Sequence, residues 1–207
     1  MTTESIDDIA QFWLHDSEQD PVQADARRQW WYYGDRSVDE AIDTQFGYMV
    51  RRAIDGEFNV WGTSSMGSLG LVLLLDQFTR NLYRHTPRAY AGDARAFLVV
   101  SEAVAAGLDT ALHPVSRIWL YHPFHHSEDL YEQDRGLGFL RSMEREADSA
   151  WKPYIARSVQ GWTRHRNIVA RFGRFPHRNE VLGRESSAEE VAFLAEDGNA
   201  FGQGARQ

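Results

Sequence analysis

The chain of 207 residues contains no cysteine and a single lysine, Lys152. The lack of cysteine excludes disulfide bonds, thiolate metal sites and a cysteine nucleophile. Because there is only one lysine, arginine supplies almost every side-chain cation. Its planar guanidinium can bind a carboxylate or a phosphate through two parallel hydrogen bonds, which favours anion recognition wherever arginines cluster.

Long hydrophobic runs are also missing. The longest apolar run near the middle of the chain, Leu69 to Leu75, is far too short to span a bilayer, and no signal peptide opens the sequence. We therefore expect a soluble cytoplasmic protein with no membrane partner. An apolar share of 43% with seven tryptophans is typical of a globular protein. We expect one domain over 1–207, with a glycine-rich tail that frays over 197–207.

Negative charge is unevenly distributed. Residues 1–60 contain 13 acids and 5 arginines, whereas six arginines and one acid, Glu180, lie between Gly161 and Arg184. The net charge of −8 argues against nucleic acid as a partner, because phosphate binding needs a broad basic face. The basic carboxy-terminal segment instead suits a small anion or the acids of the amino-terminal part.

Helical periodicity dominates the sequence, and no run alternates as a strand does. Apolar residues recur at helical spacing in the segments 5–15, 37–54, 68–81, 93–107, 114–122, 123–147, 154–172 and 187–195. About seven or eight helices joined by short loops predict an all-α protein of antiparallel hairpins. Both a bundle and a helical-repeat array fit this pattern, and no clean repeat signature decides between them.

Several residues mark the expected helix ends. Ser5 is placed to cap the first helix, and Ser187 with Glu190 has the spacing of a capping box. Gly173 is placed to end a long helix, while Gly136 and Gly138 weaken the middle of another.

The first candidate for chemistry lies at the end of the apolar run, in LDQFTRNLYR. On a helix, Asp76 and Arg80 are four residues apart, as are Gln77 and Asn81. The structural interpretation is an ordinary helical ion pair near a helix end. The functional interpretation rests on the apolar residues that precede the pair. An ion pair that is partly removed from water costs free energy, and a functional role would explain why that cost is tolerated.

The second candidate is YHPFHHSEDL. Three of its histidines and Asp129 would share a helix face and hold a divalent metal, or His126 and Glu128 would form an acid–base pair. Pro123 marks a helix start, which places His122 outside the helix and breaks the metal set, and no metal or cofactor is predicted. The simpler interpretation is that His126 and Glu128 bond neighbouring helices.

The third candidate is RFGRFPHRNEVLGRESS. Gly173 and Pro176 shape a turn, and its two phenylalanines pack inward, which leaves polar side chains for an anion pocket. Those polar side chains are Arg171, Arg174, His177, Arg178 and Asn179. The alternative is that the arginines pair with acids elsewhere in the chain.

These segments together resemble the bacterial domain-of-unknown-function family nine-two-four. The ordered matching pieces include WWYYGDRSVDEAIDTQFG, LLLDQFTRNLYRHTPRAYAGD, YHPFHHSEDLYEQ and HRNIVARFGRFPHRNEVLGRESSAEEVAFL. The resemblance implies a helical fold similar to tetratricopeptide-repeat arrays and no established activity. Its hallmark positions correspond here to Asp76, Gln77, Arg80, Asn81, His126, Ser127, Glu128, Arg171, Arg174, His177, Arg178 and Asn179.

Two functional hypotheses follow. In the first, the polar segments line one pocket that binds or acts on a small anionic molecule. Arginines would hold the anion, His126 and His177 would be acid–base groups, and Glu128 or Asp76 would orient one of them. In the second, the chain is a helical-repeat scaffold for a protein or peptide partner or a second copy, and the polar motifs serve structure only.

Overall fold

Every regular element in the described part of the protein, residues 5–33 and 36–196 of a computed structural model, is helical. The prediction of an all-α fold is therefore confirmed. Within these ranges no helix is both long enough and apolar enough to cross a membrane. The tail predicted to fray, 197–207, lies outside the described residues.

The described residues form more helical segments than the seven or eight expected. The α-helices are α1 (Ile6–Leu14), α2 (Pro21–Tyr33), α3 (Arg36–Ile54), α4 (Ser65–Val72), α5 (Thr79–Leu82), α6 (Asp93–Ala105), α7 (Pro114–Leu120), α8 (His122–His126), α9 (Leu130–Glu146), α10 (Lys152–Phe172) and α11 (Ala188–Leu194). Three shorter elements matter for the site: the π-helical turn η2 (Leu73–Phe78) and the 3-10 turns η3 (Pro87–Tyr90) and η5 (Pro176–Arg178).

The predicted caps are present. Ser5 and Asp8 form a capping box at the start of α1, and Ser187 and Glu190 form another at the start of α11. Gly173 follows α10 with a φ of 68°, a conformation that favours glycine. These ends are encoded locally, by residues three or four apart in the sequence.

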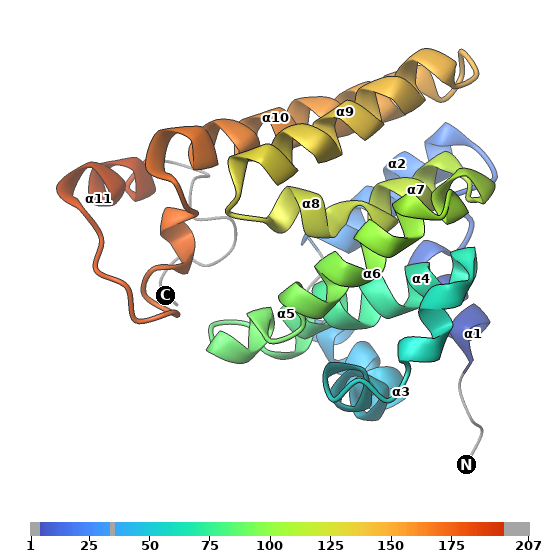
Figure 1. Ribbon diagram of the computed structural model, residues 1–207, viewed down its shortest axis with the longest axis horizontal. Helices are drawn as coiled ribbons and strands as arrows, with labels where there is room; N and C mark the ends of the chain where they lie inside the picture. The colour runs from blue at the N-terminus through green and yellow to red at the C-terminus, as the bar shows by residue number, and fades with distance from the viewer. Residues whose placement is uncertain (1–4, 34–35, 197–207) are drawn as a thin grey trace.

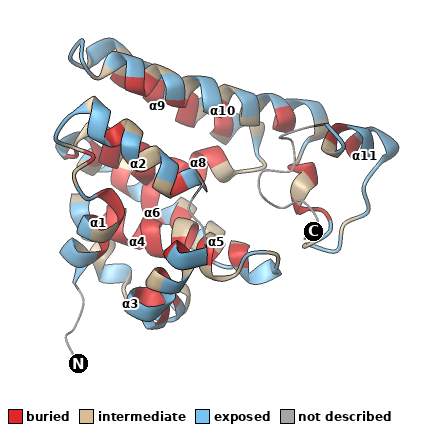
Figure 2. Ribbon diagram, turned by 180° about the vertical axis from the view of Figure 1, so that it is seen from behind, coloured by how far each residue is buried: buried red, intermediate tan, exposed pale blue. Residues whose placement is uncertain are grey.

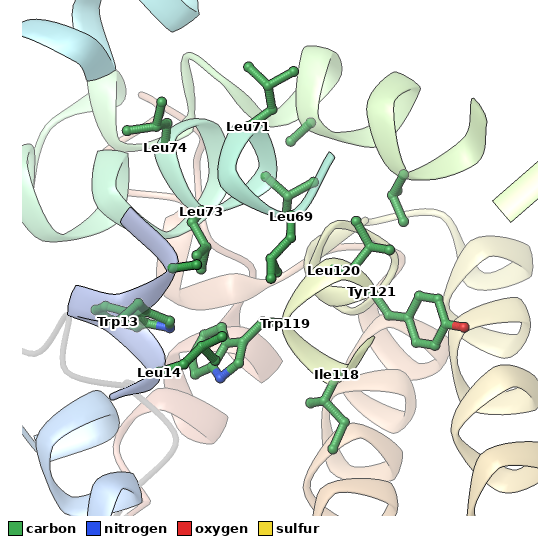
Figure 3. Close-up of a cluster of buried hydrophobic side chains, with 14 of the residues drawn as sticks. Trp13, Leu14, Leu69, Leu71, Leu73, Leu74, Ile118, Trp119, Leu120 and Tyr121 are labelled. Atoms are coloured by element: carbon green, nitrogen blue, oxygen red, sulfur yellow. The ribbon is translucent and has the colours of Figure 1, made fainter. Parts of the chain in front are cut away.

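The hydrophobic core is centred on α4 and η2, which run through the middle of the helical body (Figure 1) and are largely buried (Figure 2). Leu69 and Leu73 point from this segment toward Trp13 of α1 and Trp119 of α7 (Figure 3). The two indole rings pack edge to face with their centroids 5.0 Å apart. An aromatic pair of this kind fixes the relative positions of α1 and α7 more tightly than apolar burial alone.

Two long helices, α9 and α10, form an antiparallel hairpin along one side of the body (Figure 1). This arrangement agrees with the predicted hairpin packing, whereas likeness to tetratricopeptide arrays stays a prediction. Gly136 of α9 lies where a Cβ atom would come within 2.7 Å of the Cβ of Phe124, so its lack of a side chain lets α9 approach α8 closely. The glycine predicted to weaken this helix therefore serves packing.

A second, smaller apolar cluster holds the carboxy-terminal segment. It joins Ile168 and Val169 of α10 to Phe175 and to Phe193 of α11. Phe175 is fully buried, so it anchors the turn η5 at the end of the hairpin. The inward packing expected for this phenylalanine is confirmed, and it fixes the position of Arg178 three residues later.

One expectation about helices was wrong, and one helix was not predicted. The segment 123–147 is not one helix, because the chain leaves helical geometry at Ser127 and Asp129 caps α9, its carboxylate accepting a hydrogen bond from the Tyr131 amide at 2.8 Å. Helix α2 was not predicted, because its sequence, PVQADARRQWWYY, has no clear apolar stripe. The signal that was available is Asp20, whose carboxylate caps the helix just before Pro21.

Candidate functional site

Asp76 lies at the centre of the candidate site. It belongs to the π-helical turn η2, and its side chain is 1% exposed. The preceding leucines are fully buried, so the sequence carries this carboxylate into the interior with them. Single π-helical turns inside α-helices are frequent at functional sites, because they re-aim one or two side chains.

Arg80 joins Asp76 to a second carboxylate. Its Nη1 atom lies 3.1 Å from Asp76 Oδ1, and its two terminal nitrogens donate to Asp93 at 2.9 and 3.0 Å. Burial alone would lower the pKa of Arg80, but the two carboxylates raise it above its usual value. The predicted pair Asp76–Arg80 therefore exists, as half of a bridge to the start of α6.

His126 contacts the other oxygen of Asp76. Its Nδ1 atom lies 2.7 Å from Asp76 Oδ2. A carboxylate accepts hydrogen bonds, so we assign the proton to Nδ1 and the lone pair to Nε2. Burial, followed by the nearby Arg80 cation, lowers the pKa of His126 well below its usual value. The imidazole is therefore neutral near pH 7 and offers Nε2 as a base or hydrogen-bond acceptor.

Arg178 approaches the same place from η5. It is 6% exposed, and its Nη2 atom donates to the His126 carbonyl oxygen at 3.0 Å. The guanidinium lies over the rings of Tyr90 and Phe175, 4.9 and 4.5 Å from their centroids. Burial, followed by repulsion from Arg80, lowers the pKa of Arg178. Its charged form is thus less stable than that of an exposed arginine.

No carboxylate neutralises Arg178 directly. In the described chain, the ion pairs of this region join Arg80 to Asp76 and Asp93, and Arg184 to Glu128, but none includes Arg178. Its Nε atom is buried without a hydrogen-bond partner. A buried cation in this state is costly unless another group binds it.

Four of these residues, Asp76, Asp93, His126 and Arg178, line a cavity of about 460 Å³ between α6, α8 and the carboxy-terminal segment, whereas Arg80 is not part of the lining. A cavity of this size suits a small molecule. Its lining combines the charged groups with apolar side chains of α6 and α8: Asp76, Asp93, Ala94, Phe97, Leu98, Pro123, His126, Ser127, Glu128 and Arg178. The break between α8 and α9 is what places Ser127 and Glu128 at this wall.

Glu128 does not pair with His126. Its carboxylate accepts hydrogen bonds from Arg184 at 2.7 and 3.0 Å and from the Phe175 amide at 2.8 Å. Burial alone would raise the pKa of Glu128, but these hydrogen bonds lower it. Glu128 thus fastens the carboxy-terminal segment to the wall of the cavity, and Asp76 is the residue that orients His126.

The other predicted arginines lie elsewhere. Arg174 donates to both oxygens of Glu190, at 2.7 and 2.8 Å, and Arg171 pairs with Glu189 at 2.7 Å. Both contacts tie α10 and the following turn to α11. Neither arginine is among the residues that line the cavity.

The remaining predicted residues also lie outside the cavity lining. Gln77 donates to Asn81 at 2.8 Å, and Asn81 donates to Asp39 of α3 at 2.7 Å, so this pair faces α3. Asn179 donates to Ser186 at 3.0 Å. The ring of His177 packs near Phe175, and burial followed by the Arg178 charge lowers its pKa to about 2.

The histidines do not form a metal site. In residues 5–33 and 36–196 no group of three or more histidine or acidic side chains could hold a metal ion. His122 Nδ1 lies 2.8 Å from the Ile118 carbonyl oxygen, and the carboxylate of Asp129 caps α9. Each of these two side chains therefore has a structural partner.

Sequence reasoning missed Asp93 and the apolar wall of α6. In the sequence, Asp93 is only the first residue of the predicted helical segment 93–107, where an acid suits the helix dipole. One signal was the neighbouring Gly92, whose Cβ would lie 2.1 Å from the Leu75 carbonyl oxygen. Only glycine permits the start of α6 to lie this close to η2, and this approach brings Asp93 to Arg80.

Comparison with known proteins gives a family and a fold. The sequence matches a bacterial family of proteins of unknown function, DUF924, over residues 9–198. It is also similar to the solved structure of ATU0120, a protein of unknown function from Agrobacterium tumefaciens, with 33% identity and a TM-score of 0.75. That match covers 92% of this chain and 96% of the other. Among curated proteins, none matches. The chain therefore belongs to the bacterial family of unknown function DUF924.

Proposed function

We propose that the protein binds a small anionic molecule, a carboxylate or a phosphate, in the cavity beside Arg178. The observation that carries this proposal is the buried guanidinium, which has no carboxylate partner in the described chain and borders an open space of about 460 Å³. An anion bound there would supply the missing charge–charge hydrogen bonds.

The neighbouring carboxylates leave Arg178 free to do this. Asp76 and Asp93 share Arg80, and Glu128 is paired with Arg184. Each of the three therefore has a cation closer than Arg178. The attraction between Arg178 and a bound anion is strengthened by its burial, because a low local dielectric weakens screening.

We further propose that His126 receives a proton or a hydrogen bond from the bound molecule. Asp76 fixes the orientation of the ring, and the lone pair on Nε2 is the part of the ring left to meet a ligand. A carboxylate that orients a neutral imidazole is a recurring arrangement for general-base catalysis. The site is thus suited to an anionic molecule that carries a hydroxyl, amino or acidic C–H group.

The scaffold alternative has less support. It calls for exposed aromatic side chains gathered in one groove. The exposed tyrosines of the described residues, Tyr32, Tyr48 and Tyr131, lie on three different helices, α2, α3 and α9. A purely structural account gives Arg178 a carbonyl hydrogen bond and two aromatic rings but no carboxylate, and a buried structural cation would be expected to have a carboxylate partner.

Thermal unfolding with added anions tests the proposal. Acetate, benzoate and inorganic phosphate are titrated against the wild type, Arg178→Met and the matched control Arg171→Met. A ligand that binds only the folded state raises the melting temperature by mass action. We expect such a rise, with at least one anion, in the wild type and in Arg171→Met but not in Arg178→Met.

Stability without anions is the internal check. Removal of a buried cation that lacks a counter-ion should leave the melting temperature of Arg178→Met equal to or above that of the wild type. A rise of equal size in Arg178→Met, or no rise with any of the three anions in the wild type, would refute anion binding at Arg178.

A further inference from the structure

We infer that the bound molecule is amphipathic: its anionic head lies at Arg178 and a short apolar tail lies along α6, against Phe97 and Leu98. This inference rests on the proposed function and adds the class of molecule. It follows from an apolar wall on one side of the cavity that the polar chemistry of the site does not use.

The apolar wall has helical spacing. Ala94, Phe97 and Leu98 stand at positions i, i+3 and i+4 of α6, so they share one face, and all three line the cavity. Pro123 of α8 lines it as well. The apolar wall is therefore built from two helices and contains no charged side chain. Asp93, the first residue of α6, lies beside it at the charged end of the cavity.

The wall is fixed in place before any ligand binds. The ring of Phe97 packs edge to face on the fully buried Phe124, with centroids 5.6 Å apart. Leu98, in contrast, is 60% exposed, more than any other leucine of the described residues. An exposed leucine alone means little, but one on the wall of a cavity that also holds a buried cation is a surface that an apolar group can cover.

Helix geometry sets the direction of the tail. Asp93 begins α6 and is bonded to Arg80, so the start of the helix lies at the charged end of the cavity. Leu98 is five residues further on, about 7.5 Å along the axis. A ligand whose head is at Arg178 therefore meets polar groups first and the apolar wall farther along α6, and the distance suits a short aliphatic chain or a single aromatic ring.

The size of the effect follows from methylene transfer. Each methylene that moves from water to the wall should lower the dissociation constant about four-fold, since its burial is worth ~0.8 kcal/mol. The gain should stop when the chain outgrows the wall. A head group without a tail should bind weakly by the same account.

Isothermal titration calorimetry with two homologous series tests the inference. Acetate, butyrate, hexanoate and octanoate form one series, and inorganic, butyl and hexyl phosphate form the other. We expect affinity to rise along at least one series in the wild type, and the series with the tighter members identifies the head group. Hexylamine, with the opposite charge and the same tail as hexyl phosphate, should bind less than either anion.

Leu98→Gln is the critical variant. The substitution lies at an exposed helical position and keeps good helix propensity, so the fold should be intact. It should reduce the gain in affinity per methylene along each series. Val60→Gln is the matched control. Val60 is also an exposed apolar residue but does not line the cavity, so this variant should behave as the wild type.

The outcomes separate the two proposals. Anion binding that depends on Arg178 but is equal along both series overturns the amphipathic ligand and leaves the proposed function standing. Tighter binding of hexylamine than of hexanoate and hexyl phosphate also overturns it. No binding by any member of either series overturns both.

Discussion

The packing of α9 on α8 makes a sharp prediction through two glycines of the same helix. At Gly136 a Cβ atom would lie 2.7 Å from Phe124 Cβ and 3.1 Å from Trp162 Cζ3, whereas at Gly138 no atom lies within 4 Å of an added Cβ. Both glycines have ordinary helical backbones. Alanine therefore changes helix propensity equally at the two positions and packing at only one.

The magnitudes can be worked out from this difference. Gly138→Ala should raise the free energy of unfolding by about 0.5–1 kcal/mol, the usual helical preference of alanine over glycine. Gly136→Ala gains the same preference, but overpacking against the base of a buried phenylalanine costs about 1–3 kcal/mol. The two variants should therefore differ by roughly 2 kcal/mol, or by about 4–8 °C in melting temperature.

Urea unfolding followed by circular dichroism measures both variants under one condition. Equal slopes with different midpoints would assign the difference to stability. Because Phe124 lies two residues before His126, Gly136→Ala should also weaken anion binding, and Gly138→Ala should not. If the two alanine variants stabilise the protein equally, the close approach of α9 to α8 is incorrect.

Two further predictions concern ionisable groups. Burial lowers the pKa of His122 to about 4, so the unfolded chain takes up its proton first. The contribution of the neutral His122 ring to the free energy of unfolding should be fully present above about pH 6.5. It should be lost as the pH falls toward 4, which lowers the free energy of unfolding by up to about 3 kcal/mol. Urea unfolding at pH 7 and 4.5 measures this, and equal stability would contradict it. Glu190→Gln removes the buried partner of Arg174 and should cost about 1.5–3 kcal/mol at pH 7, while the exposed control Glu189→Gln costs little in the same assay. Equal losses would show that burial of Glu190 does not matter.

Local signals in the sequence predicted the helical class and many helix ends. Ser5, Gly173 and Ser187 each act on backbone groups within one helical turn, so their roles can be deduced without knowledge of the fold. Helix α2 was missed because its periodicity is weak and its start depends on a cap at Asp20. The same locality explains why the helix boundaries were clearer than their arrangement.

The candidate site was predicted in its members more than in its pairings. The sequence singled out Asp76, Arg80, His126 and Arg178 as polar residues in otherwise apolar surroundings. It left two carboxylates open as the partner of a histidine, Glu128 and Asp76, and the structure pairs His126 with Asp76, 50 residues away. Contacts at such separations depend on how helices pack, and periodicity within one helix carries no information about that.

The arginines of the third candidate segment also could not be distinguished from one another by sequence alone. In one short segment the sequence offered Arg171, Arg174 and Arg178 as equal candidates for anion binding. The structure separates them by their neighbours, because the capping box of α11 brings Glu190 to Arg174, and Glu189 lies beside Arg171. Arg178 differs from them because Phe175 anchors η5 in the interior, where no carboxylate of the described residues reaches it.

The central claim is that the buried Arg178 guanidinium binds a small anion. A crystal structure of the protein grown with 4-bromobenzoate tests this claim most directly. The bromine gives an anomalous signal that locates the molecule without reference to the rest of the density. We expect a carboxylate within hydrogen-bond distance of the Arg178 guanidinium and a bromine peak beside Leu98. An empty cavity, with Arg178 ion-paired to Asp93 or Glu128, would contradict it.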